Sequence, residues 1–411
     1  MITHMLDSFA ESKQFNIVSM HHEQSAAFAA EGIARHTKGK TIAVAMGTSG
    51  PGATNLITGI GDCWFDSVPC LFITGQVNTR ELKGDRAIRQ QGFQELDIVE
   101  VVRSLTKYAV RVDRPEDLLP ELHKALSTTL SGRQGPVLLD IPNDIQRADI
   151  SDALVEKWLK VPLQIHHGPE ATPSALMQLE DLCKAAQRPL VCIGGGARWA
   201  DAMDEWLLAA DTLGIPYVAT LMGHERVVAR NNYFNMIGSY GNREANWAVQ
   251  NCDLLIVIGA RLDVRQTGSD TDDFARKASV VQIDIDPAQL GNRVQADLNI
   301  CATADSFFKT FPLRADIFPS LDKSWVTELS KHRDRTQSNE YADWEISPSE
   351  LFKRLNHILS KHSVDYVCDV GNHQMWAAQS LRLSPNQAVH YSGGMGAMGF
   401  AFPTALGVAI Q

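Results

Sequence analysis

Short apolar runs alternate with helical patterns along the whole chain, and this alternation constrains the fold more than any other feature. The runs have the length of strands, and the segments between them have the apolar spacing of helices. A repeated strand–helix–strand order favours parallel sheets covered by helices. We therefore predict an α/β fold with three consecutive doubly wound parallel sheets, the third incomplete. The expected strands lie at 41–46, 69–74, 136–141, 190–193, 253–258, 280–284 and 364–369.

Two polar stretches of weaker periodicity divide these strands into three sets. The stretches lie at about 148–172 and 312–346, and the second contains the charge run Lys331–Arg335. We expect domain boundaries at both places. The third set is too short for a complete doubly wound sheet. The predicted domains are 1–150, 171–315 and 347–411.

The two ends of the chain carry distinctive patterns. A helical pattern over 3–12 precedes a strand-like run at 16–19 that no earlier strand can pair with, so we expect a first strand and its glycine turn to be missing. The uncharged segment 392–411 has the length of a membrane span. Its glycines and Pro403 favour instead a glycine loop that leads into a buried helix.

The composition argues against several classes of protein. Of the 411 residues, 44% are hydrophobic and 21% are charged, as in soluble globular proteins. The net charge of −10 argues against nucleic acid or an anionic membrane as the main partner. The seven cysteines form no CxxC pair and the first residues do not form a signal peptide, so we expect free thiols in the reducing cytoplasm.

Two segments near the N-terminus contain residues suited to a binding site. Glu23 lies at the expected start of an alanine-rich helix, where the helix dipole favours a carboxylate. At 47–52 a strand enters a glycine turn and then a helix, which offers backbone N–H groups to an anion or a cofactor. Taken alone, Glu23 is explained by stabilisation of a helix end, and many α/β proteins have such a turn.

The order and spacing of several motifs are more specific than either segment alone. The motifs are His22–Gln24, Thr48–Asn55, Asp66–Pro69, Ile73–Val77, Gly92–Glu95, Pro136–Pro142 and Gly371–Ala378. In this order they resemble the thiamine-diphosphate enzymes of the acetolactate synthase group, and the resemblance covers essentially the whole chain. It implies a pyrimidine-binding domain, a middle domain and the beginning of a diphosphate-binding domain.

The resemblance implies thiamine diphosphate as the cofactor, whose thiazolium carbon attacks a carbonyl and stores the resulting carbanion. Glu23 matches the glutamate that hydrogen-bonds the pyrimidine ring and promotes the imino tautomer, which removes the thiazolium C2 proton. Gln76, Phe93 and Lys107 match residues near the substrate channel. We take Glu23, Gln76 and Lys107 as the catalytic candidates.

The resemblance also assigns residues to the diphosphate side of this cofactor. Gly371, Asn372 and His373 match the segment that contacts the diphosphate, although the family more often has glutamine where Asn372 stands. Gly396 and Met398 match the pair that meets the aminopyrimidine and holds the cofactor bent. Without the resemblance, Met398 would be interpreted as core packing. No residue of this chain is assigned to Mg²⁺, whose ligands are expected beyond the last residue.

A second glycine turn, Gly194–Gly196, follows a strand of the middle domain but lacks the complete dinucleotide fingerprint. A plain NAD-binding module built on it would leave the motifs over 20–77 unexplained. In the acetolactate synthase group the matching segments hold FAD in a non-redox role, so the resemblance implies FAD, with an empty or ADP-like pocket as the alternative. The residues assigned to FAD are Arg133, Gly194, Gly195, Gly196, Thr220, Leu221, Gly238, Gly259, Ala260, Arg261, Asp263, Arg265, Asp284 and Ile285.

Departures from the family pattern leave FAD and the substrate less constrained than thiamine diphosphate. Val264 replaces the family's second aspartate, Ser239-Tyr240 replaces its common Met-His, and Asn143 stands where many synthases have lysine. Arg261 matches an arginine that receives the carboxylate of the second keto acid, with a salt bridge or an FAD contact as the alternative. The segment 78–92 is longer and more charged than the usual synthase loop.

The resemblance implies a carboligase that decarboxylates pyruvate and transfers the two-carbon unit to a second 2-keto acid. The resemblance implies homodimers or homotetramers with shared active sites, and it leaves a regulatory small subunit open. The alternatives are a related decarboxylase, lyase, hydrolase or acyltransferase acting on another keto or sugar substrate, or an incomplete and inactive chain.

Overall fold

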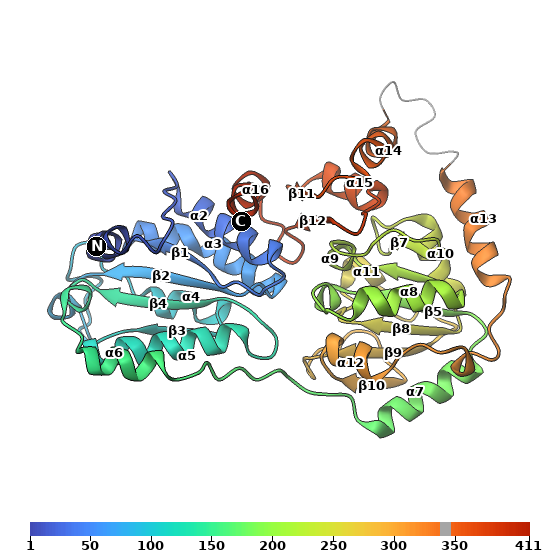
Figure 1. Ribbon diagram of the computed structural model, residues 1–411, viewed down its shortest axis with the longest axis horizontal. Helices are drawn as coiled ribbons and strands as arrows, with labels where there is room; N and C mark the ends of the chain where they lie inside the picture. Colours follow the sequence, from blue (N-terminus) through green and yellow to red (C-terminus); the bar gives the residue numbers. More distant parts are fainter. Residues whose placement is uncertain (338–346) are drawn as a thin grey trace. The chain divides into compact units, whose positions relative to one another are not determined.

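The computed structural model describes residues 1–337 and 347–411. The chain forms two compact units, one of residues 1–167 with 392–411 and one of residues 168–391. Each unit combines helices with strands, and every strand pair among the described residues is parallel (Figure 1). The predicted α/β fold with parallel sheets is confirmed.

The first unit has a four-stranded sheet of order β1-β2-β4-β3. Every residue of β2 and β4 is buried. Apolar runs of this kind are typical of parallel strands covered on both faces. The strands are β1 (Ala43–Gly47), β2 (Cys70–Gln76), β3 (Tyr108–Arg111) and β4 (Val137–Pro142), and three of them match predicted runs.

The helices of the first unit pack around this sheet, and α2, α3 and α5 contact its strands directly. The helix predicted over 3–12 is confirmed, but the strand predicted at 16–19 is wrong: these four residues are exposed and form no strand, since no neighbouring strand pairs with them. The longer helices are α1 (Thr3–Ser12), α2 (Glu23–His36), α3 (Pro51–Asp66), α5 (Leu118–Leu130) and α6 (Asp152–Leu159). The short ones are η1 (Thr79–Glu81), α4 (Ile98–Val102), η2 (Arg103–Leu105), η3 (Pro115–Asp117) and η4 (Ile145–Arg147).

The last helix, α16 (Ala401–Ile410), packs against α2 within the first unit. Glycines make this approach possible: a Cβ at Gly32 would lie 2.2 Å from the carbonyl oxygen of Thr404, and a Cβ at Gly407 would lie 1.9 Å from that of Ala29. The predicted glycine loop and helix over 392–411 are confirmed. Only one face of this helix is buried, and Phe402 on another face is 76% exposed.

Replacing Gly407 with alanine should separate α16 from α2, because the added methyl group meets backbone and not a movable side chain. Overpacking of this kind typically costs about 1–3 kcal/mol, so we expect a lower midpoint of thermal unfolding. Ala409→Met enlarges an exposed residue of the same helix and is the control. An unchanged midpoint for Gly407→Ala would show that the two helices are not held in this contact.

The second unit has a six-stranded sheet of order β10-β9-β8-β5-β6-β7. The strand order reverses at β5, which lies between β6 and β8. In open α/β sheets, ligands bind outside the carboxyl ends of the strands at such a switch point. The strands are β5 (Pro189–Ile193), β6 (Tyr217–Ala219), β7 (Tyr233–Met236), β8 (Leu254–Ile258), β9 (Ser279–Asp284) and β10 (Leu298–Cys301).

Helices pack against this sheet through two buried apolar clusters. The polar stretch predicted at 312–346 is partly helical, and Trp325 and Leu329 of α13 are buried in one of these clusters; residues 338–346 lie outside the described residues. The helices are α7 (Pro173–Ala185), η5 (Gly195–Ala197), α8 (Met203–Leu213), α9 (Leu221–His224), α10 (Arg243–Asn251), α11 (Val264–Thr267), α12 (Ala304–Thr310), η6 (Ala315–Ile317), α13 (Trp325–Gln337), α14 (Pro348–Leu359) and α15 (Asn372–Ser380).

The region predicted as a third domain contains a two-stranded parallel sheet of β11 (Val364–Cys368) and β12 (Gln387–Tyr391). This short sheet fits an incomplete third domain, while the domain boundaries stay a prediction. The seven cysteines form no disulfide, and five of them are buried. None of the helices in the part of the chain that the structure describes is long and apolar enough to cross a membrane.

Candidate functional site

Glu23 is the first residue of α2, and its side chain faces the glycine turn that follows β1. One carboxylate oxygen, Oε2, accepts a hydrogen bond of 3.0 Å from Nδ2 of Asn55 in the first turns of α3. A Cβ at Gly52 would lie 3.1 Å from the other oxygen, Oε1. The starts of α2 and α3 therefore place a half-buried, oriented carboxylate at the carboxyl end of β1.

The glycine turn itself has features that suit a polar ligand. Gly50 adopts a φ of +58°, a region that favours glycine, immediately before Pro51 begins the 16-residue helix α3. Ser49 is 1% exposed, and its hydroxyl has no hydrogen-bond partner among the described residues. Buried hydroxyls normally have a partner. An unpaired hydroxyl near an oriented carboxylate and a helix N-terminus fits a site for an amino-substituted heterocycle such as the cofactor's pyrimidine.

Gln76, the second catalytic candidate, ends β2 and is buried. Its amide nitrogen donates to the carbonyl oxygen of Leu96 (2.7 Å) and to a carboxylate oxygen of Asp140 (3.0 Å). Its amide oxygen accepts from the backbone N–H of Val77 (3.0 Å). Burial raises the pKa of Asp140 to about 7. In this chain Gln76 links the carboxyl ends of β2 and β4, and its catalytic role stays a prediction.

Lys107, the third catalytic candidate, lies at the opposite ends of the strands of the same sheet. It precedes β3, and its backbone N–H bonds to Pro136 before β4, so it lies at the amino ends of parallel strands whose carboxyl ends carry Gln76. Its ammonium group donates to the carbonyl oxygens of Thr128 and Ser131, both at 2.5 Å, and burial lowers its pKa to about 8. Within one chain, Lys107 does not join Glu23, and its catalytic role stays a prediction.

The residues assigned to the diphosphate side occur in both units. Gly371 has a φ of +152° and caps α15, and Asn372 and His373 follow it as exposed residues of the first turn. Free N–H groups of such a helix start suit an anion. Gly396 has a φ of +69° in the loop before α16, and Met398 is 77% exposed. This exposure argues against the alternative interpretation of Met398 as core packing.

The residues assigned to FAD lie mostly at the carboxyl ends of the second sheet. The turns after β5 and β8 pack against each other: Gly196 donates its N–H to the carbonyl oxygen of Gly259 (2.9 Å), and a Cβ at Gly194 would lie 2.1 Å from that oxygen. Arg261 is 4.0 Å from Asp263 and 38% exposed, so its guanidinium is accessible.

The remaining FAD assignments follow the neighbouring strands. Thr220 follows β6 and caps α9 by accepting from the N–H of Gly223 (3.2 Å). Arg133 belongs to the first unit, where it donates to the hydroxyl of Ser67 (2.9 Å). The others are Gly195 after β5, Leu221 after β6, Gly238 after β7, Ala260 and Arg265 after β8, and Asp284 and Ile285 at the end of β9. FAD binding stays a prediction.

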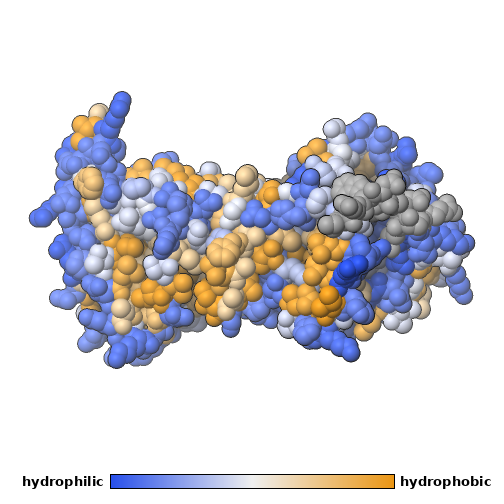
Figure 2. Space-filling view, turned by 90° about the horizontal axis from the view of Figure 1, so that it is seen from above, coloured by the Kyte–Doolittle hydropathy of each residue, from blue (hydrophilic) through white to orange (hydrophobic). Residues whose placement is uncertain are grey.

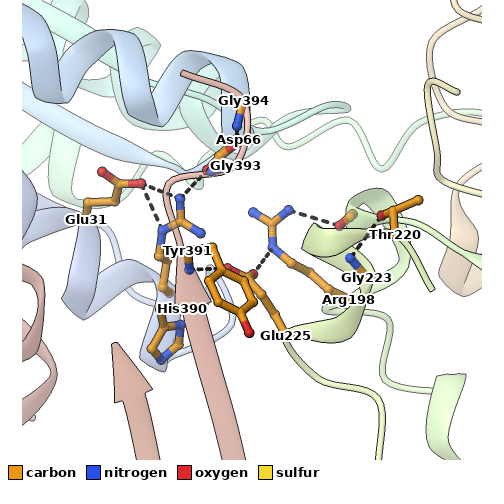
Figure 3. A network of polar contacts seen from close by, with 12 residues as sticks. Glu31, Asp66, Arg198, Thr220, Gly223, Glu225, His390, Tyr391, Gly393 and Gly394 are labelled. Atoms are coloured by element: carbon orange, nitrogen blue, oxygen red, sulfur yellow. Dashed lines mark hydrogen bonds and ion pairs between the residues drawn. The ribbon is translucent and has the colours of Figure 1, made fainter. Parts of the chain in front are cut away.

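The second unit also contains an ion pair that sequence reasoning missed. Arg198 lies 3.1 Å from the carboxylate of Glu225 and donates to the carbonyl oxygen of Gly195 (3.0 Å). Glu225 in turn accepts from the backbone N–H of Tyr391 at the end of β12 (3.0 Å) (Figure 3). The pair thus connects the glycine turn after β5 with β12.

The first unit contains a buried ionic cluster that sequence reasoning also missed (Figure 3). Arg35 of α2 donates from Nε (2.9 Å) and an amino group (2.6 Å) to Oε1 of Glu31, one turn earlier in the same helix. The same amino group donates to Asp66 at the end of α3 (2.6 Å). Asp62, one turn before Asp66, completes a set of three carboxyl groups, and one oxygen from each lies within 4.8 Å of the other two. Pairs of charges four residues apart in two helices rich in alanine and glycine were the available signal.

Comparisons with known proteins agree with these motifs. The chain matches the thiamine pyrophosphate enzyme N-terminal TPP binding domain over residues 1–101, the central domain over 176–311 and the C-terminal TPP binding domain over 369–411. It is 37% identical over 403 residues to the acetolactate synthase large subunit of Parasynechococcus marenigrum, covering 96% of this chain and 62% of that protein.

Two further relatives give the same result. A probable acetolactate synthase large subunit of Methanocaldococcus jannaschii is 32% identical over 421 residues, covering 98% of this chain and 68% of that protein. The acetolactate synthase large subunit of Corynebacterium glutamicum is 36% identical over 409 residues, covering 98% of this chain and 63% of that protein. The chain thus spans between 57% and 68% of the length of the curated relatives it matches.

Proposed function

Because the chain belongs to the thiamine pyrophosphate enzyme family, we propose that it acts in a thiamine-diphosphate-dependent carboligase of the acetolactate synthase type. The enzyme decarboxylates pyruvate and joins the two-carbon unit to a second 2-keto acid in the cytoplasm. The observation that carries this proposal is the carboxylate of Glu23, held by Asn55 against the glycine turn after β1. The similarity to acetolactate synthase large subunits supports the choice of reaction.

Each of the chain's own groups has a defined task in this proposal. When bound, thiamine diphosphate supplies the carbon nucleophile that attacks the keto acid. Glu23 accepts a hydrogen bond from the pyrimidine ring and holds the proton there, and Asn55 fixes the direction of the carboxylate. The buried residues of α2 behind Glu23 exclude water, which strengthens this hydrogen bond. The start of α15, with Gly371, binds the diphosphate through backbone N–H groups.

The proposed enzyme also binds FAD and Mg²⁺. FAD binds at the carboxyl ends of the second sheet in a structural role, and the reversal of strand order there supports a ligand site. Mg²⁺ accompanies the diphosphate, as is usual for phosphate groups. A regulatory small subunit stays open, and nucleic acid and membranes are not among the expected partners.

An exposed apolar face on α16 supports the proposed homo-oligomer. Phe402, Leu406 and Ile410 are spaced four residues apart, so they lie on one side of the helix, and they are 76%, 38% and 40% exposed. Hydrophobic residues are visible on the surface seen from above in Figure 2. Apolar faces of this kind are typical of subunit interfaces. We therefore propose a homodimer or homotetramer with shared active sites.

Product analysis tests the proposed reaction. Incubation of the enzyme with pyruvate, thiamine diphosphate and Mg²⁺ should yield acetolactate, detected by mass spectrometry. The charged loop 78–92 supports one alternative, a related decarboxylase, lyase, hydrolase or acyltransferase on another keto or sugar substrate. Glu95 holds this loop in a defined shape by accepting from the N–H groups of Lys83 (2.6 Å), Gln91 (2.8 Å) and Gly92 (3.1 Å). Consumption of pyruvate without acetolactate would contradict the carboligation and favour a related decarboxylase, and no consumption of pyruvate would contradict the proposal.

A further inference from the structure

The buried ionic cluster of α2 and α3 also holds the loop that precedes α16. Asp66 accepts from the backbone N–H groups of Gly393 (3.0 Å) and Gly394 (2.7 Å). Asp62 accepts from the hydroxyl of Ser392 (2.7 Å), and that hydroxyl accepts from the N–H of Ala397 (2.7 Å). The two carboxyl groups thus fix the beginning of the loop, and the Ser392 hydroxyl connects this beginning to Ala397. Gly396 and Met398, the residues matched to cofactor contact, lie in this loop.

Two oxygen atoms of the cluster have no hydrogen-bond donor among the described residues. They are Oε2 of Glu31 and Oδ2 of Asp62, and both are buried. All three carboxyl groups face a single guanidinium, that of Arg35, so full ionisation would leave two uncompensated negative charges in a buried site. Buried carboxylates without compensation retain a proton. One proton placed between the two oxygens would satisfy both of them.

We propose that Glu31 and Asp62 share one proton, and that this protonated pair, together with Arg35 and Asp66, fixes the loop 392–399 in the position from which Gly396 and Met398 contact the cofactor. The contact with the cofactor rests on the proposed function, whereas the anchoring of the loop does not. Glu31, Asp62 and Asp66 are positioning residues in this proposal, since they act through the loop.

The surroundings of the shared proton determine the direction of its pH dependence. Burial raises the pKa of Glu31 to about 7, and burial together with the charges of Glu31 and Asp66 raises the pKa of Asp62. The groups that face the pair are Arg35 of α2, Cys63 and Asp66 of α3, and Ser392 of the loop, and Cys70 of β2 contacts Cys63. Of these only Arg35 is a cation.

The sign follows from the raised pKa values. Both groups bind a proton more tightly in the folded protein than in the unfolded chain, so the cluster is stable at acidic pH and loses stability as the pH rises through about 7. Loss of the proton adds a negative charge beside Asp62 and Asp66. The loop should therefore loosen at alkaline pH, and the affinity for thiamine diphosphate should fall with it.

Hydrogen exchange of the peptide covering 392–399, measured by mass spectrometry at about pH 6 and about pH 8.5, tests the anchoring without any cofactor. After correction for the intrinsic pH dependence of exchange, the wild type should exchange faster at the higher pH by about tenfold, the factor equal to one pKa unit of coupling. Glu31→Gln supplies an amide donor toward Asp62 and still accepts from Arg35, so its loop should stay protected at both pH values. Asp66→Asn should raise the hydrogen exchange of the loop at both pH values.

Asp253→Asn is the matched control, because Asp253 accepts from two consecutive backbone N–H groups, those of Gln187 (2.8 Å) and Arg188 (2.9 Å), away from the loop. It should leave the exchange of 392–399 as in the wild type. Ser392→Ala removes one anchor while keeping every buried charge, and it should raise exchange even if Asp66→Asn does not fold. Unchanged exchange in Ser392→Ala, or a pH dependence that persists in Glu31→Gln, would overturn the proposal.

Calorimetric titration with thiamine diphosphate and Mg²⁺ gives the second readout. The dissociation constant should rise with pH in the wild type and stay constant in Glu31→Gln. An enzyme whose loop follows the expected exchange but which binds no thiamine diphosphate at either pH would refute the proposed function and the cofactor contact, and leave the anchoring supported. If the hydrogen exchange of the loop depends on pH but the dissociation constant of thiamine diphosphate does not, the proposed link between the loop and the cofactor is overturned.

Discussion

Turnover should fall by about 10²–10⁴-fold when Glu23 is replaced with glutamine, because a positioned acid–base group contributes an effect of that size. The amide of glutamine still forms hydrogen bonds from the start of α2, but it cannot exchange a proton with the pyrimidine ring. Binding of thiamine diphosphate should therefore remain within about threefold, which corresponds to less than 1 kcal/mol. Steady-state kinetics and calorimetric titration together separate these two effects.

Asp152 is a suitable control for this variant, since it is an exposed acidic residue in the first turn of another helix, α6. Asp152→Asn removes a similar charge from a similar position and should change neither turnover nor cofactor binding. Asn55→Ala releases the carboxylate of Glu23 without removing it, and it should lower turnover less than Glu23→Gln does. Wild-type turnover in Glu23→Gln would exclude Glu23 as the activating residue.

The strands were predictable where the sequence signal was local. Runs such as 136–141 and 253–258 are buried along their whole length, so they appear as continuous apolar segments. The strand β7 was missed because its sequence, Tyr233–Met236, has no apolar run of that kind and is recognised only by its neighbour β6. The predicted strand at 16–19 failed for the opposite reason, since its apolar residues lack a partner strand and stay exposed.

In the candidate site, too, only features that depend on local sequence could be predicted. Glu23 and the glycine turn were predictable, because a helix start and a tight turn are local features. The contacts of Asp62 and Asp66 with the loop at 392–394 join residues more than 300 positions apart, and no local pattern indicates them. Only the packing of the helices shows that the carboxyl groups outnumber the single guanidinium.

Replacing Arg35 with methionine should be the most destabilising single change in the first unit. Its guanidinium is fully buried, donates to Glu31 and Asp66, and lies 5.4 Å from the centre of the Phe400 ring. Methionine keeps much of the apolar volume but leaves three buried carboxyl groups without a cation. Removing one partner of a buried ion pair typically costs about 3–5 kcal/mol. Chemical denaturation should show a loss of this size near neutral pH.

The pH dependence of this loss distinguishes charge from packing. Without Arg35, ionising Glu31 and Asp62 in the folded protein becomes less favourable, so the pKa values of these two groups rise further above those of the unfolded chain. Arg35→Met should therefore be closest to the wild type at about pH 5, where protonated carboxyl groups need no cation, and furthest from it at about pH 8. Arg103→Met removes an exposed guanidinium from its pair with Glu100 and should have no measurable effect at either pH. A loss for Arg35→Met that is equal at both pH values would mean that the side chain stabilises the unit by packing, and that the cluster does not depend on its charge.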